Sequence, residues 1–314
     1  MSTTGGSPLP RALFTGLIDD AAVFPPGNAS IADALTAHAH HRRQWYAAFV
    51  GPLLLPAAEL AEATEVMALR EVRPPESSAL REGHPSEATE ATVLREGRPS
   101  HAAEHLEIVV VARPGVAMEV VRAATDLAQA TAGIVLRATE IGWQPRWREA
   151  ALDTPVLVLE LPRGEVATVV ADIATGAAGQ RAIGKFRTGA TPTWPWPDAA
   201  ELAHVLGTAA RADLPLKLTG GLHHLVRGTY ADQENHGLLN VLLAAHLAQN
   251  AAPLAQLIDV LEERDSVTLS DHLAALRPAQ VRRTRGLIPA YGCCTVTDPI
   301  AELTASHLLE GPLP

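Results

Sequence analysis

Two lysines at the ends of short apolar stretches are the side chains of this sequence best suited to chemistry. Lys185 lies in the stretch 183–189 (IGKFRTG), and Lys217, 32 positions later, lies in the stretch 214–221 (LPLKLTGG). That separation is the length of one strand–helix–strand unit, and adjacent parallel strands lie about 4.8 Å apart. We therefore expect two ammonium groups side by side, each lowering the pKa of the other. A lowered lysine pKa is what Schiff-base chemistry requires.

A reactive lysine also needs partners that move protons and hold the substrate. Arg187 follows Lys185 by two residues and so shares its face of the strand, which suits it to bind an acidic group of the substrate. The candidates for proton transfer are Asp20, Glu107, His223 and His224. The other residues expected to contact the substrate are Thr188, Gly189, Gly220, Gly221, Arg227 and Tyr291.

A metal centre is the alternative that the acidic and histidine residues leave open. Imidazole and carboxylate ligands together suit Zn, Mn or Fe. The set that could supply them is Asp19, Asp20, His223, His224 and His236. The sequence contains no H-E-x-x-H motif. The Schiff-base hypothesis needs no cofactor, whereas this alternative needs a divalent metal and predicts a hydrolase, isomerase or lyase.

Eight apolar stretches alternate with helix-like segments, which indicates a parallel sheet with both faces covered. Eight such repeats, with no G-x-G-x-x-G after the first strand, favour a single-domain (β/α)8 barrel over residues 13–314. The expected strands cover 17–23, 47–55, 106–112, 133–138, 155–161, 182–188, 214–219 and 286–291. Chemistry in such barrels occurs at the carboxyl ends of the strands. Other polar residues expected there are Asp19, Arg137, Glu140, Glu160 and Cys293.

Two segments are expected to lie outside the regular barrel. Residues 1–12 are predicted to be a flexible lead. Residues 69–105 carry an imperfect repeat (LREVRPP, LREGHPS, LREGRPS) rich in Pro, Glu, Ser and Arg, which is typical of a disordered insertion. This insertion would extend the loop between the second helix and the third strand. A third hypothesis is a non-catalytic binding barrel whose insertion contacts a partner.

Composition narrows the class of partner. The formal net charge of −10 disfavours a nucleic-acid or anionic-membrane surface, and no apolar run approaches the roughly 20 residues of a membrane span.

The N-terminus shows no secretory signal, and the only cysteines are the adjacent pair Cys293 and Cys294. One of these two must face inward from a strand end. We expect a cytoplasmic protein with a small-molecule substrate, and the sequence leaves open whether it forms a homo-oligomer.

The motifs K-F-R-T-G (185–189) and K-L-T-G-G (217–221) resemble the paired lysine motifs of deoxyribose-phosphate aldolase and its class I relatives. The stretches 17–26 and 47–56 resemble the first two strands of that family. The resemblance implies a (β/α)8 barrel in which Lys185 forms the Schiff base, Lys217 tunes its pKa and Glu107 supplies the acidic partner on the third strand. The family's glycine–serine-rich phosphate turn is replaced here by YGCCT (291–295).

The LIDD and GLHH segments also resemble those of a group of bacterial proteins without an assigned activity. Taken together, the sequence predicts a Schiff-base-forming lyase of the aldolase type that acts on a small polar carbonyl or keto-acid substrate.

Overall fold

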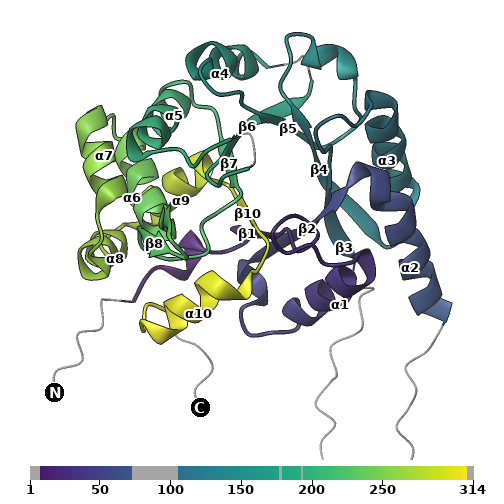
Figure 1. The fold of residues 1–314 in the computed structure, drawn as a ribbon, viewed down its shortest axis with the longest axis horizontal. Helices are drawn as coiled ribbons and strands as arrows, with labels where there is room; N and C mark the ends of the chain where they lie inside the picture. Colours follow the sequence, from purple (N-terminus) through teal and green to yellow (C-terminus); the bar gives the residue numbers. More distant parts are fainter. Residues whose placement is uncertain (1–7, 73–104, 177–178, 192–193, 310–314) are drawn as a thin grey trace, which may run out of the picture.

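In the computed structural model, which describes residues 8–72, 105–176, 179–191 and 194–309, eight parallel strands close into a barrel in the order β1-β10-β7-β6-β5-β4-β3-β2. Figure 1 shows the helices ringing this barrel. The barrel strands are β1 (Ile18–Asp20), β2 (Val50–Pro56), β3 (Leu106–Val111), β4 (Ile134–Gly142), β5 (Val156–Glu160), β6 (Arg181–Arg187), β7 (Leu216–Thr219) and β10 (Tyr291–Cys293). The predicted (β/α)8 fold is therefore confirmed.

The helices lie on the outer face of the barrel, and some of them begin at a residue whose side chain caps the first turn. Ser30 caps the first helix by accepting from the backbone N–H of Asp33, and Asp198 caps the fifth by accepting from that of Glu201. The helices are α1 (Ile31–His41), α2 (Leu60–Val72), α3 (Met118–Ala130), α4 (Val166–Ala174), α5 (Ala199–Arg211), α6 (Leu238–Gln249), α7 (Leu254–Glu262), α8 (Ser266–Ala274), α9 (Pro278–Leu287) and α10 (Thr297–Ala305). Short 3-10 turns cover Arg11–Leu13, Ala47–Phe49, Ala57–Glu59 and Trp147–Ala150.

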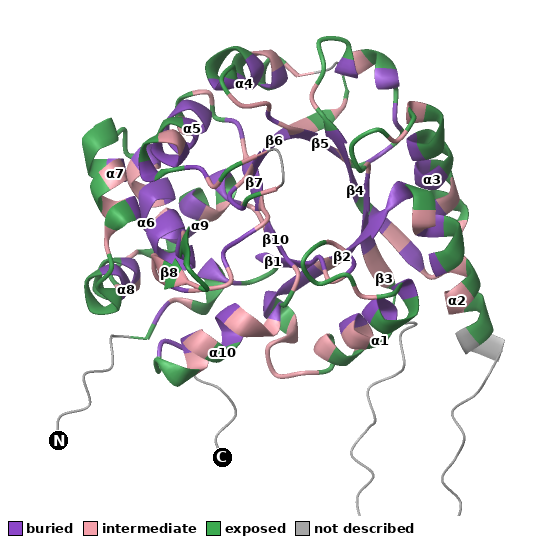
Figure 2. Cartoon of the chain, in the orientation of Figure 1, coloured by how far each residue is buried: buried purple, intermediate pink, exposed green. Residues whose placement is uncertain are grey.

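Strand residues divide by parity between two apolar clusters, because successive side chains point to opposite faces. The larger cluster joins the outer face of the strands to the helices, and Figure 2 shows the resulting buried stripes on both. The smaller cluster fills the barrel interior and comprises Ala21, Leu54, Val109, Val111, Ala138, Val158 and Ile183. The side chains next to this cluster toward the carboxyl ends are polar, and these form the site described below.

Strand β4 contains an irregularity that changes which residues face inward. The pairing of β3 with β4 runs Ile108 with Leu136 and then Val109 with Ala138, so Arg137 is an extra residue. Before it, Leu136 belongs to the outer cluster, whereas Ala138 after it belongs to the inner one. The bulge therefore turns Glu140, two residues beyond Ala138, into the barrel.

The chain between β7 and β10 is longer than a simple connection and adds helices outside the ring. An antiparallel hairpin, β8 (Gly228–Tyr230) with β9 (Gln233–Asn235), precedes α6, and α7 and α8 lie outside α6 in Figure 1. Helices α8 and α9 are separate, because Pro278 begins α9. The predicted strand at 286–291 begins later, since Leu287 and Ile288 are buried at the end of α9.

The lead and the insertion differ in how much of them the structure describes. Residues 1–7 lie outside the described residues, but the prediction of a flexible lead up to residue 12 is wrong for the remainder. Leu9 is buried and donates its backbone N–H to Leu308 (2.9 Å), because apolar Leu9 and Leu13 join the outer core. Residues 73–104 of the predicted insertion also lie outside the described residues, and they fall between α2 and β3 as expected.

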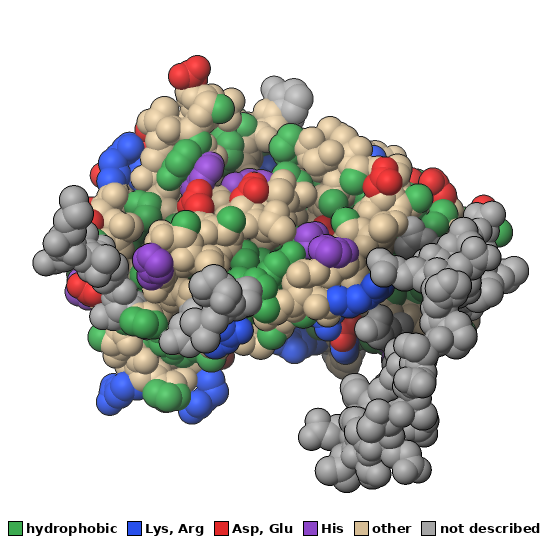
Figure 3. Space-filling view, turned by 90° about the horizontal axis from the view of Figure 1, so that it is seen from below, with side chains coloured by type: hydrophobic (Ala, Val, Ile, Leu, Met, Phe, Trp, Pro, Cys, Tyr) green, Lys and Arg blue, Asp and Glu red, His purple; other side chains and the backbone are tan. Residues whose placement is uncertain are grey.

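The surface mixes side chains of different kinds. Figure 3 shows acidic, basic, histidine and hydrophobic side chains interspersed on one side of the molecule. Within the described residues, no helix is both long enough and apolar enough to cross a membrane.

Candidate active site

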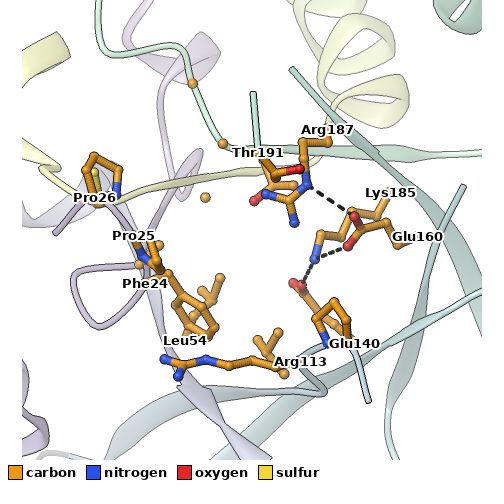
Figure 4. Close-up of a pocket in the computed structure, with 18 of the residues that line it drawn as sticks. Phe24, Pro25, Pro26, Leu54, Arg113, Glu140, Glu160, Lys185, Arg187 and Thr191 are labelled. Atoms are coloured by element: carbon orange, nitrogen blue, oxygen red, sulfur yellow. Dashed lines mark hydrogen bonds and ion pairs between the residues drawn. The ribbon is translucent and has the colours of Figure 1, made fainter. Parts of the chain in front are cut away.

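A cavity of about 410 Å³ opens at the carboxyl ends of the barrel strands. Figure 4 shows a charged wall on one side of it, with Phe24, Pro25 and Pro26 of the loop after β1 on the opposite side. Leu54 and Arg113 line the cavity between the two walls. The charged wall consists of Glu140, Glu160, Lys185 and Arg187. The volume of the cavity is in the range of sites that bind small molecules.

The two lysines lie side by side on neighbouring strands, as predicted. Lys185 of β6 pairs in register with Lys217 of β7. Ile183, two residues before Lys185, belongs to the inner cluster, so Lys185 and Arg187 share the inward face of β6. Lys185 lines the cavity, whereas Lys217 is not among its lining residues and is buried. Lys185 is therefore the amine that a bound molecule can reach.

Carboxylates separate the two ammonium groups and continue into a chain of alternating charge. Lys217 contacts Asp19 and lies 2.6 Å from Oε1 of Glu140. The other oxygen of Glu140 accepts from Lys185 at 2.7 Å. Lys185 in turn lies 3.0 Å from Glu160, whose second oxygen lies 3.3 Å from Nε of Arg187. We call the six groups the charge chain: Asp19, Lys217, Glu140, Lys185, Glu160 and Arg187.

The charge chain reverses the expected direction of the lysine pKa. Burial lowers the pKa of Lys185, but the attraction of Glu140 and Glu160 outweighs it, so the pKa is raised overall. The pKa of Lys217 is likewise raised by Asp19 and Glu140 against the effect of burial. The prediction that two neighbouring ammonium groups depress each other's pKa is wrong, because carboxylates lie between and beside them.

The carboxylates respond in the complementary sense. Burial raises the pKa of Glu140, yet the ammonium groups of Lys185 and Lys217 bring it down to about 2. Burial acts the same way on Glu160, and Lys185 and Arg187 lower its pKa overall. Burial raises the pKa of Asp19, and Lys217 opposes that rise. The resting site therefore holds an ammonium at Lys185 between two carboxylates.

The predicted proton-transfer carboxylates lie outside this arrangement. Asp20 points away from the barrel interior, because it follows inward-facing Asp19, and it pairs with buried His38 of α1 at 3.0 Å. Glu107 is the second residue of β3, at the amino-terminal end of the barrel, where it pairs with Arg137. Both predictions are corrected: Asp19 replaces Asp20 at the inner face, and Glu140 of β4 occupies the position between the lysines.

The predicted substrate-contacting residues divide into those at the cavity and those elsewhere. Arg187, Gly220 and Gly221 line it. Thr188 and Gly189 support its rim instead: the Thr188 hydroxyl donates to the carbonyl of Thr219 at 3.2 Å, and a Cβ at Gly189 would lie 1.4 Å from the carbonyl oxygen of Gly220. Only glycine permits that close approach between the turns after β6 and β7.

The structure does not bring Arg227 and Tyr291 to the cavity. Arg227 lies 3.5 Å from Glu234 of the β8–β9 hairpin. Tyr291 is buried in the outer cluster, because it occupies the outward parity of β10. The same parity buries Cys293 against the helices and leaves Cys294 at the cavity, so one cysteine of the pair faces inward as predicted.

The five residues predicted as alternative metal ligands are dispersed. Asp19 pairs with Lys217 and Asp20 with His38. His224 is not among the cavity-lining residues, and it pairs with Glu302 and stacks on Tyr230. His236 is buried and bonds through Nε2 to the carbonyl of Pro197. His223 lines the cavity but pairs with Asp298. Across the described residues, no group of three or more His, Cys, Asp or Glu side chains is placed to hold a metal ion.

Sequence reasoning placed Glu140 and Glu160 near strand ends without giving them a role. The scarcity of lysine in the sequence is a signal that points to this site. The sequence has 25 Lys and Arg residues, and Lys185 and Lys217 are the only two lysines. Arginine is used at every other strongly basic position, so the only side-chain primary amines of the chain lie in the barrel interior.

No protein-family model, curated protein or solved structure matches the chain. Its class therefore comes from the fold and the cavity. A closed parallel (β/α)8 barrel with a charged cavity at the carboxyl ends of its strands has the architecture, and the position of the site, that enzymes of this fold use.

Proposed function

We propose that this barrel is a Schiff-base-forming lyase of the aldolase type that acts on a small polar carbonyl or keto-acid substrate. The observation that carries the proposal is the position of Lys185. It is one of only two lysines in the chain, it lines the cavity, and carboxylate oxygens of Glu140 and Glu160 lie 2.7 and 3.0 Å from its amine nitrogen. The resemblance of both lysine motifs to class I aldolases supports the same chemistry.

The two carboxylates suit the product of Schiff-base formation. For attack, the Lys185 ammonium first gives a proton to Glu160, which is the more exposed of its two acidic partners. The amine then adds to the carbonyl carbon, and water leaves with the proton. Ammonium plus carbonyl thus becomes iminium plus water, with no change in net charge. Glu140 and Glu160, which stabilise the ammonium, stabilise the iminium in the same way.

The iminium then acts as the electron sink for breaking an adjacent bond. Electrons from the α C–C or C–H bond move toward nitrogen, and Glu160 is placed to accept the proton released. Lys217, beside Lys185 on the neighbouring strand, does not line the cavity. In this proposal it holds Glu140 ionised, since its ammonium contributes to the low pKa of that carboxylate.

The cavity also has cationic groups for an acidic substituent of the substrate. Arg187 lies beside Lys185 on the charged wall, and Arg113 lines the cavity between the two walls in Figure 4. Both side chains are partly exposed. A guanidinium binds a carboxylate through two parallel hydrogen bonds, which favours a keto acid over an uncharged ketone.

Reduction of the bound adduct tests this proposal directly. Incubation with small keto acids or hydroxyaldehydes and sodium borohydride is expected to fix the adduct on Lys185, found by peptide mass mapping. Because the chain has only two lysines, any other side-chain amine adduct must be on Lys217, which serves as the internal control. Lys185→Arg keeps the positive charge and is expected to trap none. Equal trapping by that variant, or an adduct on Lys217 alone, would overturn the proposal.

A further inference from the structure

A second group of reactive side chains lies at the same cavity, apart from the charge chain. Sγ of Cys294 lies 3.3 Å from Nε2 of His223. The other ring nitrogen of His223, Nδ1, lies 3.0 Å from Oδ2 of Asp298 in the first turn of α10. A thiol, an imidazole and a carboxylate in this order are the parts of an activated nucleophile: the imidazole takes the proton, and the carboxylate fixes the ring orientation.

The thiol lies on the wall opposite the reactive lysine. Cys294 and His223 both line the cavity. A Cβ placed on Gly27 would lie 3.1 Å from Cβ of Cys294, so the cysteine packs against the loop that carries Pro25 and Pro26. Figure 4 shows those prolines across the cavity from Lys185. A molecule in the cavity can therefore meet an amine on one side and a thiol on the other.

The surroundings of the pair favour a thiolate and an imidazolium. Hydrogen bonds to Cys293 and Cys294 raise the pKa of His223 to about 11. Burial raises the pKa of Cys294, but its hydrogen bond and attraction to His223 outweigh burial and lower it overall. Burial raises the pKa of Cys293, which lies 3.7 Å from Nδ1 of the same ring. The pKa is therefore raised at Cys293 and lowered at Cys294, and of the two only Cys294 lines the cavity.

We propose that Cys294, with His223 as its acid–base partner and Asp298 as the residue that orients His223, is a second carbonyl-reactive nucleophile of this cavity, and that it captures small anionic aldehydes. The thiolate adds to the aldehyde carbon: the C–S bond forms, the C=O π bond opens, and the imidazolium gives its proton to the resulting alkoxide. The product is a hemithioacetal, and the step reverses by the same path. It needs no leaving group and no co-reactant.

The expected negative charge of the aldehyde follows from the cationic side chains that line the cavity. Arg113 and Arg187 line the same cavity and are partly exposed to it. An aldehyde that carries a carboxylate can place that group on a guanidinium while its carbonyl carbon reaches the thiolate. This capture does not depend on Schiff-base formation at Lys185, so either proposal can fail while the other holds.

Alkylation by iodoacetamide at pH 7 tests the activation. Cys294 is expected to react about tenfold faster in the wild type than in His223→Gln, because the thiolate fraction falls without the imidazolium. Asp298→Asn keeps His223 and is expected to give an intermediate rate. Cys294→Ser identifies the reacting residue by mass mapping. Circular dichroism confirms the fold of each variant. Equal rates in the wild type and both His223→Gln and Asp298→Asn would refute the activation.

Glyoxylate, an aldehyde that carries a carboxylate, tests the ligand class. Its addition is expected to remove the ultraviolet absorbance of the Cys294 thiolate reversibly in the wild type, with no change in Cys294→Ser. An imine at Lys185 leaves that absorbance in place, so the readout separates the two carbonyl reactions. If the thiolate absorbance persists at saturating glyoxylate, Cys294 does not capture aldehydes and the proposal is wrong.

Discussion

Glu140 interacts with both lysines at once, and this single residue explains most of the electrostatics of the site. Its two oxygens lie 2.7 Å from the Lys185 nitrogen and 2.6 Å from the Lys217 nitrogen. A carboxylate in that position keeps both amines protonated at rest. Schiff-base formation at Lys185 therefore starts from the ammonium, and its rate depends on how readily a neighbouring carboxylate accepts the proton.

Adduct formation at Lys185 should consequently rise with pH. The folded-state pKa of Lys185 is raised above its ordinary value of 10.5, so the neutral amine increases throughout the range below that pKa. Glu160→Gln is expected to shift the profile to lower pH, because the ammonium loses a stabilising charge, and to lower the maximal rate, because the proposed proton acceptor is lost. The measurement is the initial rate of borohydride-trapped adduct from about pH 6 to about pH 10, just below the pKa of an ordinary lysine. Glu107→Gln, at the opposite end of the barrel, is the control and should leave the profile in place.

At the residue scale, the sequence identified pairs of neighbours but could not choose between them. Asp19 and Asp20 are adjacent, and so are Cys293 and Cys294, and in each pair one member faces inward. Which member faces inward depends on which alternate residues of the strand point into the barrel. A strand of three residues is too short for its sequence pattern to show this. The inward face of β6 was predicted correctly, because Lys185 and Arg187 are two residues apart and therefore share one face.

At the scale of the element, the bulge in β4 determines whether the site is complete. Arg137 is half-exposed and pairs with Glu107, so its own interactions are those of a surface residue. Its importance lies in its presence as an extra residue between Leu136 and Ala138. The predicted strand ended at 138, and an apolar pattern alone gives no sign that parity changes at that point.

Deletion of Arg137 is expected to cost far more than its substitution. Deletion restores strict alternation, which turns either Glu140 or the outer-cluster residues of β4 to the wrong face. We expect a loss of about 3–5 kcal/mol in the free energy of unfolding, together with loss of adduct formation, since buried charges would lose their partners. Arg137→Ala keeps the residue count and removes only an exposed ion pair, at a cost of about 1 kcal/mol or less. Urea denaturation of both variants compares them, and similar losses would contradict this role of the bulge.

The repeating part of the fold was predictable from the sequence, and the irregular part was not. The alternation of apolar stretches with helix-like segments predicted the barrel. The β8–β9 hairpin was missed because its strands have three residues each and none of these residues is buried. The start of β10 was placed too early because Leu287 and Ile288 are apolar for a different reason, burial at the end of α9.

At the scale of the whole molecule, the buried histidine His236 links folding to pH. Burial is the main cause that lowers its pKa, to about 4, and the nearby Arg227 acts in the same direction. The unfolded chain takes up this proton near pH 6.5, whereas the folded chain does not until about pH 4. Stability from this group is therefore fully present above the unfolded pKa and is lost as pH falls through that window, by up to about 3 kcal/mol.

The substitution His236→Gln should remove that dependence. Glutamine can keep a donor toward the carbonyl of Pro197 and has no proton to take up in this range. Urea denaturation at pH 7 and pH 4.5 is expected to show a smaller fall in the free energy of unfolding for the variant than for the wild type. An equal fall in both proteins would show that His236 is not the group responsible.

The charge chain should also make pairs of substitutions less damaging than single ones. Lys217→Met leaves Asp19 and Glu140 buried without their shared cation, which we expect to cost about 3–5 kcal/mol. Adding Asp19→Asn removes the carboxylate that has lost its ion-pair partner, whereas Glu140 keeps Lys185. The double variant should therefore be more stable than Lys217→Met by about 1 kcal/mol or more, the coupling seen between contacting residues. A double-mutant cycle by denaturation measures this coupling, and additive losses would argue against it.

The extra residue in β4 also bears on how this protein should be compared with other barrels. Before Arg137 the even-numbered residues of β4 face outward, and after it the even-numbered residues face inward. An alignment made by counting residues from the start of β4 would match Glu140 with an outward-facing residue in any barrel that lacks the bulge. Relatives of this site are therefore better sought by superposing the inward-facing positions of β4, β6 and β7 than by aligning letters.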